Sequence, residues 1–212
     1  MPNLKKNRFS NWFYYRLKRL DYGRNYKNYW EERGKTLMKT EINNPITVKY
    51  AQFLGNYISN LQPTPESILE YGCGYGGKLT VLEQKFSGKH VKLFGVDISS
   101  TNLDNARSIL KNTTLKLVDG VTIPYDNKQF DLSFTASVLQ HVPEKDFSKI
   151  CNELIRVTKH TIIHVEAPVA YTHKFPHKYD SFYKDKGFKV KIFTKPDIDQ
   201  ALMWYKIDLM LK

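Results

Sequence analysis

The run ILEYGCGYGG, residues 68–77, constrains the fold more than any other part of the chain. Its apolar start predicts a buried strand, its glycines predict a tight turn, and a helix is expected to begin near Lys78. Glycine adopts backbone angles that clash for other residues, and it lets the main chain approach a ligand closely. The first N–H groups of the helix lack partners within it and can face a bound anion or nucleotide. The sequence therefore predicts a strand–turn–helix unit that suits a nucleotide-like cofactor.

The glycines alone leave the identity of the cofactor open. Gly72, Gly74 and Gly77 fit the dinucleotide pattern G-x-G-x-x-G. Gly72, Gly74 and Gly76, with Glu70 two residues ahead, also fit the different pattern acidic-x-G-x-G-x-G. A turn that binds no ligand is the third alternative. The motifs that follow must decide among these.

A second apolar stretch, residues 91–96, ends in Asp97. This acid lies about 20 residues past the last glycine, where doubly wound folds place a carboxylate over ribose hydroxyls. A carboxylate can accept hydrogen bonds from both hydroxyls, which fixes the sugar. The alternative is that Asp97 caps the next helix, although Ser99 or Ser100 could do so instead.

The region 123–143 narrows the choice. It contains a Pro124-Tyr125 turn, then Phe130-Asp131, an apolar strand, and the ending VLQHVP. With the acidic glycine motif and Asp97, it resembles the generic, type 11/25-like branch of the class I S-adenosylmethionine-dependent methyltransferases. The resemblance covers about residues 66–166. A nicotinamide-dependent oxidoreductase would have no reason to carry the motif of residues 123–143.

This resemblance implies that S-adenosyl-L-methionine is the cofactor. It implies that Asp97 binds the ribose, that Ile98 lies against the adenine, and that Asp119 accepts from the adenine amino group. Asp-Gly is also an ordinary turn pair, so Asp119 has a purely structural alternative. The expected cofactor-binding residues are Glu70, Gly72, Gly74, Gly76, Asp97, Ile98, Asp119, Gly120, Val121 and Thr135.

The fold class expected is α/β, because strands and helices alternate along most of the chain. We expect a doubly wound, mostly parallel seven-stranded sheet with a C-terminal antiparallel hairpin and an N-terminal helical cap. The expected strands are 67–71, 91–96, 115–118, 130–134, 160–165, 188–193 and 204–211, with the last two as half-exposed edge strands. The expected helices are 45–61, 78–86, 100–110 and 144–157. Residues 1–62 are interpreted as a basic, aromatic arm with a cap helix, and 63–212 as a Rossmann-like domain.

Three histidines are the candidates for catalysis. His141 lies in the VLQHVP ending, and His173 and His177 lie in a later loop. Packing or capping explains His141 as well as catalysis does. The spacing of the histidines is not diagnostic of a metal, and we expect none.

The expected acceptor is a hydroxyl of a small-molecule or glycan-type compound. Enzymes that methylate the amino groups of nucleobases often carry Asn/Asp-Pro-Pro-aromatic after strand four, and that place is interpreted as SFTA, residues 133–136. Enzymes that methylate pyrimidine C5 use a cysteine nucleophile near this strand. This chain has none there, since Cys151 falls in a predicted helix. If the acceptor is a hydroxyl, a nearby base would help the transfer.

Residues 1–30 contribute most of the net positive charge. The whole chain has 33 Lys and Arg against 21 Asp and Glu, a net charge of +12, and +7 of it lies in this arm among many aromatic residues. Such a segment suits RNA, an anionic membrane surface, or a cap over the cofactor. An RNA methyltransferase, or a non-catalytic nucleic-acid-binding protein on the same fold, is therefore the alternative. With two distant cysteines and no apolar run of about 18 residues, we expect no transmembrane segment and a cytoplasmic location.

Overall fold

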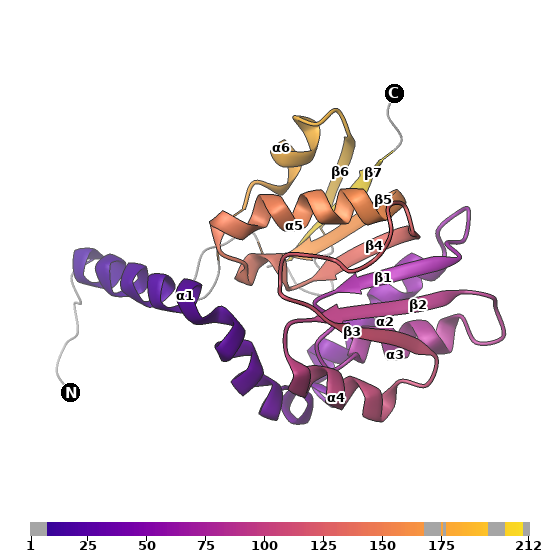
Figure 1. Ribbon diagram of the computed structural model, residues 1–212, viewed down its shortest axis with the longest axis horizontal. Helices are drawn as coiled ribbons and strands as arrows, with labels where there is room; N and C mark the ends of the chain where they lie inside the picture. The colour runs from indigo at the N-terminus through magenta and orange to yellow at the C-terminus, as the bar shows by residue number, and fades with distance from the viewer. Residues whose placement is uncertain (1–7, 168–174, 176, 195–201, 210–212) are drawn as a thin grey trace.

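The computed structural model describes residues 8–167, 175, 177–194 and 202–209, with side chains described at residue 22 and from residue 25 onward. The strands form one sheet in the order β3-β2-β1-β4-β5-β7-β6 (Figure 1). The first five strands along the chain are parallel, and β7 is antiparallel to both β5 and β6. The strands are β1 (Ser67–Tyr71), β2 (Lys92–Asp97), β3 (Thr113–Leu117), β4 (Phe130–Ala136), β5 (Thr158–Glu166), β6 (Lys189–Thr194) and β7 (Met203–Asp208).

Helices cover both faces of this sheet (Figure 1). Successive residues of β1 point to opposite faces, so Ile68 belongs to one apolar core and Leu69 to the other. Helices α2, α3 and α4 supply the first core, and α5 and α6 supply the second. The helices are α1 (Arg8–Glu41), α2 (Pro45–Ser59), α3 (Gly77–Lys85), α4 (Ser100–Ile109), the single 3₁₀ turn η1 (Leu139–His141), α5 (Glu144–Val157) and α6 (Tyr179–Lys184).

The predicted fold class is confirmed, with one correction at the C-terminal hairpin. We expected both hairpin strands at the edge of the sheet, but β7 lies between β5 and β6. Of the two hairpin strands, β6 alone lies at an edge. The interior position explains why Trp204 and Ile207 of β7 are buried. Full burial of such a side chain contributes roughly 1.5–3 kcal/mol to folding.

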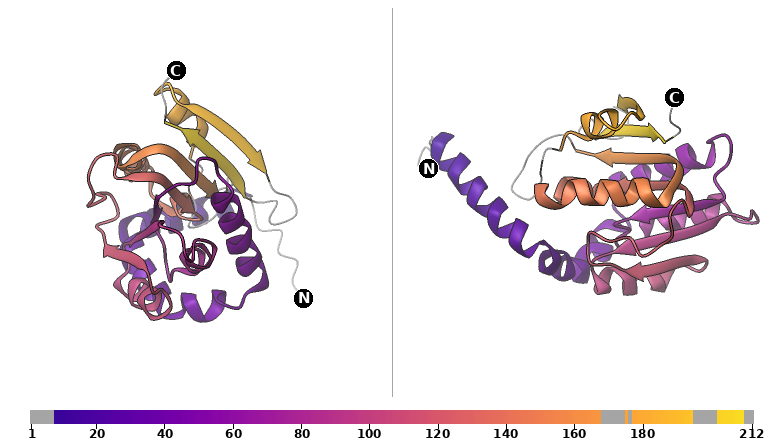
Figure 2. Two further views of the ribbon diagram at one scale, coloured as in Figure 1. Left: turned by 90° about the vertical axis from the view of Figure 1, so that its right-hand side faces the viewer. Right: turned by 45° about the horizontal axis from the view of Figure 1, so that its top comes forward.

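Helix α1 is longer than the expected arm, since it continues to Glu41 as a helix with a bend at Asn25 (φ −120°, ψ 18°). The part before the bend extends away from the sheet, and the part after it crosses toward α4 (Figures 1 and 2). Glu31 fixes the second part, because its carboxylate accepts from the N–H of Thr101 and from the hydroxyls of Ser100 and Thr101 at the start of α4. Four backbone N–H groups at a helix N-terminus lack partners within the helix, so an acid there is stabilising.

Candidate active site

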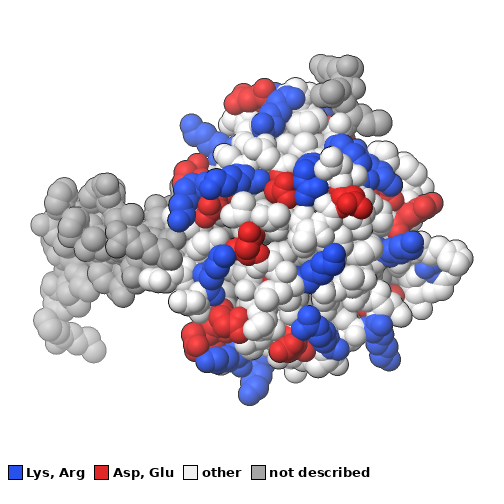
Figure 3. Space-filling model, viewed as in Figure 1, with Lys and Arg blue, Asp and Glu red and all other residues white. Residues whose placement is uncertain are grey.

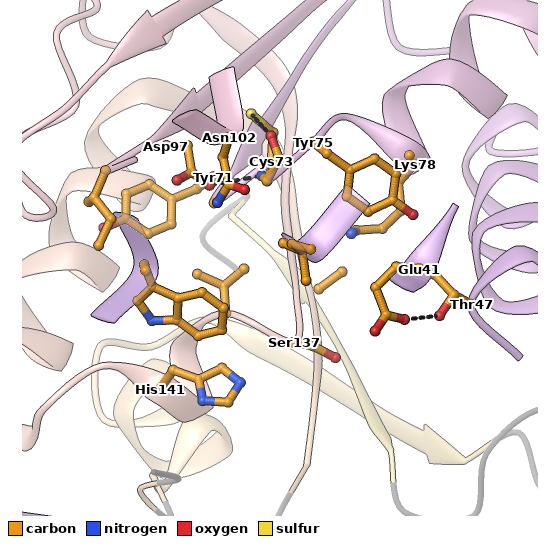
Figure 4. Close-up of a pocket in the computed structure, with 18 of the residues that line it drawn as sticks. Glu41, Thr47, Tyr71, Cys73, Tyr75, Lys78, Asp97, Asn102, Ser137 and His141 are labelled. Atoms are coloured by element: carbon orange, nitrogen blue, oxygen red, sulfur yellow. Dashed lines mark hydrogen bonds between the residues drawn. The ribbon is translucent and has the colours of Figure 1, made fainter. Parts of the chain in front are cut away.

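A cavity of about 310 Å³ lies between the second half of α1 and the loops that follow β1, β2 and β4 (Figure 4). Parallel strands all end at the same edge of a sheet, and ligands of such folds bind there. The glycine turn and the ends of β2 and β4 form one wall. The opposite wall comes from α1 and α2, through Tyr26, Trp30, Leu37, Glu41, Thr47, Tyr50 and Ala51.

The glycine turn has the strained geometry that its sequence predicts. Gly72, Gly74 and Gly76 have φ angles of 73°, 55° and 85°, all in the left-handed region. Their Cα atoms differ in what surrounds them. A Cβ at Gly72 would lie 2.5 Å from Val138, and one at Gly76 would lie 2.7 Å from Leu110. A Cβ at Gly74 would meet only Leu37, at 3.7 Å, and would extend into the cavity. The absence of a side chain at Gly74 therefore leaves room for a ligand, whereas at Gly72 and Gly76 it leaves room for the packed side chains of Val138 and Leu110.

Asp97 links the turn to α4 and lines the cavity. Its Oδ2 accepts from the N–H of Gly74 (2.8 Å), and its Oδ1 accepts from that of Ser99 (2.9 Å). Burial raises the pKa of the Asp97 carboxyl, and these backbone hydrogen bonds act against that rise. Each oxygen has a second lone pair, so the carboxylate can still accept from a ligand. Ser99 caps α4 through Asn102 N, as the sequence allowed.

Comparison with known proteins identifies the family of this region. Residues 68–161 match the family model described as a methyltransferase domain. Residues 68–161 thus form a methyltransferase domain. It is 28% identical over 99 residues to norajmaline N-methyltransferase of Rauvolfia serpentina and 26% identical over 98 residues to tocopherol O-methyltransferase of Arabidopsis thaliana. These alignments cover 44% and 43% of the chain but only 32% and 27% of the relatives.

Two solved structures illustrate how far the methyltransferase fold extends along the chain. Magnesium protoporphyrin IX methyltransferase from Synechocystis PCC 6803, solved with S-adenosylhomocysteine, aligns with a TM-score of 0.67 at 15% identity. That alignment covers 86% of this chain and 97% of the other. A methyltransferase from Aquifex aeolicus aligns with a TM-score of 0.66 at 16% identity, over 84% and 98% of the two chains. At these identities the likeness shows the shared fold.

The residues of the cavity fit S-adenosylmethionine, the cofactor of this family. The space beside Gly74 admits a ligand against the main chain, and Asp97 offers acceptors for ribose hydroxyls. Asn102 also lines the cavity, and its buried Oδ1 accepts no hydrogen bond among the described residues. Asn102 was not among the residues expected from the sequence.

Glu70 and Thr135 do not line the cavity of the methyltransferase domain, contrary to expectation. Glu70 is fully buried and pairs with Lys78 Nζ at 3.2 Å, and burial raises the pKa of its carboxyl to about 7 against the pull of Lys78. Thr135 is buried within β4, where its hydroxyl donates to Glu166 (2.7 Å) and lies 2.8 Å from His164 Nδ1. The physical reason is that β4 continues to Ala136, so Thr135 is a strand residue rather than a loop residue.

The loop after β3 holds Asp119, Gly120 and Val121 beside the cavity rather than in its wall. Asp119 is exposed, and its Oδ1 accepts from the N–H groups of Val121 and Thr122, both at 2.7 Å. These hydrogen bonds, that of Val121 first, lower the pKa of the Asp119 carboxyl. A Cβ at Gly120 would lie 2.9 Å from Ile98, which does line the cavity. The adenine role of Asp119 remains a prediction, and its turn role is what the contacts show.

His141 lies in the cavity wall at the end of η1. Trp30 of α1 meets its ring edge to face, with 5.0 Å between ring centres. The hydroxyl of Tyr22 donates to the backbone oxygen of His141 (3.0 Å) and accepts from Trp30 Nε1 (2.8 Å). Gln140 Nε2 lies 3.2 Å from His141 Nε2. Helix α1 and the segment after β4 are thus joined around this histidine.

His177 lies outside the cavity wall, behind the loop that carries His141. Its Nε2 lies 2.9 Å from the oxygen of Val142, its Nδ1 lies 2.9 Å from Glu144, and its ring stacks on Phe147 at 4.1 Å. Burial lowers the pKa of His177. These contacts give it an anchoring role, and its expected catalytic role has no support in the geometry. His173 lies outside the described residues.

The segment after β4 required a second correction. We interpreted residues 133–136 as the stretch that follows the strand, but they are its last residues, and Ser137 to Gln140 follow instead. Ser137 has a φ of 60°, lines the cavity, and donates from its N–H to Val165. Glu166 then accepts from the N–H groups of the next three residues at 3.1–3.2 Å. The new stretch, SVLQ, also lacks the Asn/Asp-Pro-Pro-aromatic motif.

The sequence offered one signal for the residues of α1 that line the cavity. Tyr26, Trp30, Leu37 and Glu41 are separated by four, seven and four residues, which places them on one face of a helix. Their role as a wall depends on the packing of α1, and no local pattern reports that. Thr47 and Tyr50 of α2 were missed for the same reason.

The described part of the chain has no metal-binding group of three or more His, Cys, Asp or Glu residues. Among its helices, none combines the length and apolar character needed to cross a membrane. On the face that Figure 3 shows, Lys and Arg are interspersed with Asp and Glu. The side chains of residues 8–21 lie outside the described ones, so binding of RNA or an anionic membrane by residues 1–30 stays a prediction.

Proposed function

We propose that this protein transfers a methyl group from S-adenosylmethionine to a hydroxyl of a small-molecule or glycan-type acceptor. The observation that carries the proposal is the wall that α1 places opposite the glycine turn. It leaves a cavity of about 310 Å³, at the lower end of the range of small-ligand pockets. A cavity of this size, walled on one side by α1, favours a small acceptor over a folded macromolecule.

The bound cofactor would supply a methyl group already activated by a sulfonium. The residues of the chain then need to hold the acceptor in line with it, and positioning of this kind can be worth about 7–11 kcal/mol. Trp30, Val138 and Val142 form the apolar part of the wall near His141. Such a surface excludes water and orients an acceptor through its shape.

His141 is the group that we assign to take the hydroxyl proton. Gln140 Oε1 accepts from the N–H of Ala167 (2.7 Å), which turns the amide nitrogen of Gln140 toward the ring. Neutral His141 therefore accepts at Nε2 and carries its proton on Nδ1. For Nε2 to receive a proton, the acceptor hydroxyl must replace this amide as its partner. The Gln140 contact thus keeps Nε2 unprotonated before the acceptor binds.

The comparisons support a small acceptor and leave its reacting atom open. One relative is named as an N-methyltransferase of norajmaline and the other as an O-methyltransferase of tocopherol. The hydroxyl assignment rests instead on His141 in the wall and on the stretch SVLQ after β4.

The test is a radiolabel-transfer assay with tritiated S-adenosylmethionine. The acceptors are paired phenols and anilines of equal size, simple sugars, secondary amines and total RNA. We expect transfer to hydroxyl compounds, a product that resists alkali as a methyl ether does and a methyl ester does not, and at least a hundredfold lower kcat for His141→Ala. Labelling confined to amines would overturn the hydroxyl assignment, and labelling confined to RNA would support the nucleic-acid alternative.

A further inference from the structure

The two ends of the cavity each carry one acidic side chain from a different part of the chain. Asp97, at the end of β2, lies at one end with Asn102, and Glu41, the last residue of α1, lies at the other with Tyr75 (Figure 4). The glycine turn runs between these ends. An elongated ligand that crosses the turn would therefore meet a carboxylate at both ends.

Glu41 is held in place although its position in the helix is unfavourable. The hydroxyl of Thr47 in α2 donates to its Oε2 at 2.7 Å, and Arg33 lies 3.6 Å from its Oε1. Its side chain is 27% exposed. The C-terminal end of a helix carries a partial negative charge, which disfavours an acid there. A cation bound in the cavity beside Glu41 would offset that repulsion.

S-adenosylmethionine has a matching arrangement of groups. If Asp97 binds the ribose, the amino-acid part extends across Gly74 toward Tyr75 and Glu41. That part ends in an ammonium and a carboxylate. We propose that Glu41 binds the α-ammonium group of the cofactor. Helix α1 then contacts the amino-acid end of the cofactor, and Asp97 contacts the nucleoside end. This inference rests on the use of this cofactor and is independent of the acceptor.

The nearby charges fit this assignment. Lys78 also lines the cavity, but its ammonium pairs with the buried Glu70 at 3.2 Å, so it does not compete for Glu41. The contacts that Glu41 makes are the hydroxyls of Thr40 and Thr47 and the Arg33 guanidinium at 3.6 Å, and Arg33 does not line the cavity. Gly77 and Lys78, the first residues of α3, also line the cavity. Helix N-termini bind carboxylates, so this helix can accept the cofactor carboxylate while Glu41 takes the ammonium.

Calorimetric titration with two ligands separates this contact from a general effect. S-adenosylhomocysteine carries the amino-acid part, and 5′-methylthioadenosine keeps the adenosine and the sulfur but lacks it. Glu41→Gln should bind S-adenosylhomocysteine about tenfold more weakly, because hydrogen bonds to charged groups contribute about 1.5–3 kcal/mol. Its affinity for 5′-methylthioadenosine should stay within about twofold of the unmodified protein.

Glu32→Gln is the matched control, since Glu32 lies on the same helix, is exposed and pairs with Lys35. It should leave both affinities unchanged. Thr47→Val keeps the Glu41 charge and removes its donor, so it should weaken S-adenosylhomocysteine alone, by roughly threefold. Unchanged binding of S-adenosylhomocysteine by Glu41→Gln, or an equal loss for both ligands, would overturn the proposal. Neither titration involves an acceptor, so a failed hydroxyl assignment would leave this result untouched.

Discussion

Alanine substitutions at two glycines can separate the effect of backbone strain on stability from the effect of a blocked ligand site on binding. Gly74, in the turn after β1, has a φ of 55°, and Gly88, after α3, has a φ of 75°. Alanine at either position costs about 1–2 kcal/mol of stability, because its Cβ disfavours the left-handed backbone conformation. They differ in their surroundings, because a Cβ at Gly88 meets nothing within 4 Å and one at Gly74 enters the cavity.

Gly74→Ala and Gly88→Ala should therefore lose similar stability but differ in binding. For a protein of this size, 1–2 kcal/mol lowers Tm by roughly 2–8 °C. The methyl group at position 74 would occupy space that the cofactor needs against the main chain. We expect Gly74→Ala to bind S-adenosylhomocysteine at least tenfold more weakly, about 1.4 kcal/mol or more. Gly88→Ala should bind it as the unmodified protein does.

Thermal melts without ligand, followed by calorimetric titration, measure both quantities on the same samples. Gly76→Ala adds a third case, since its Cβ would lie 2.7 Å from Leu110 and should cost more stability than either. If Gly74→Ala bound S-adenosylhomocysteine with unchanged affinity, the space beside Gly74 would not be the cofactor site, and the geometric reasoning would be refuted.

Three further predictions follow from single contacts. Asp97→Ala should reduce affinity for S-adenosylhomocysteine at least tenfold in calorimetry, and unchanged binding would remove the ribose assignment. Burial lowers the pKa of His164 to about 3 from 6.5, so the unfolded state binds an extra proton between these values. This histidine therefore makes the free energy of unfolding fall as the pH drops, by up to about 1.4 kcal/mol per pH unit. In urea unfolding, His164→Gln should show a smaller fall between pH 6 and pH 4 than the unmodified protein does. A protein without residues 1–21 should bind S-adenosylhomocysteine within about twofold of the full chain, because the cavity-lining residues of α1 whose side chains are described begin at Tyr26; a larger loss in the same titration would give the removed segment a role in cofactor binding.

The parts of the fold that local patterns determine could be predicted from the sequence. The strand and glycine turn at residues 67–77 were expected because apolar residues, glycines and a helix start follow one another within a short stretch. Asp97 was expected in the cavity because it ends an apolar strand, and it lies there. In both cases the information lies within about ten residues of the site.

The features that the sequence did not reveal depend on distant segments. The position of β7 between β5 and β6 is decided by pairing across the sheet, so its alternating pattern was equally consistent with an edge strand. Thr135 was assigned to the cofactor because the end of β4 was placed two residues too early. Glu41 was missed because its place in the cavity wall depends on how α1 crosses the domain.

The attachment of α1 to α4 has a kinetic consequence. The second half of α1 forms a wall of the cavity, and Glu31 ties it to Ser100 and Thr101. Any movement of this helix away from α4 has to break those bonds. If such a movement limits the exchange of spent for fresh cofactor, the residence time of the product depends on contacts that touch neither substrate.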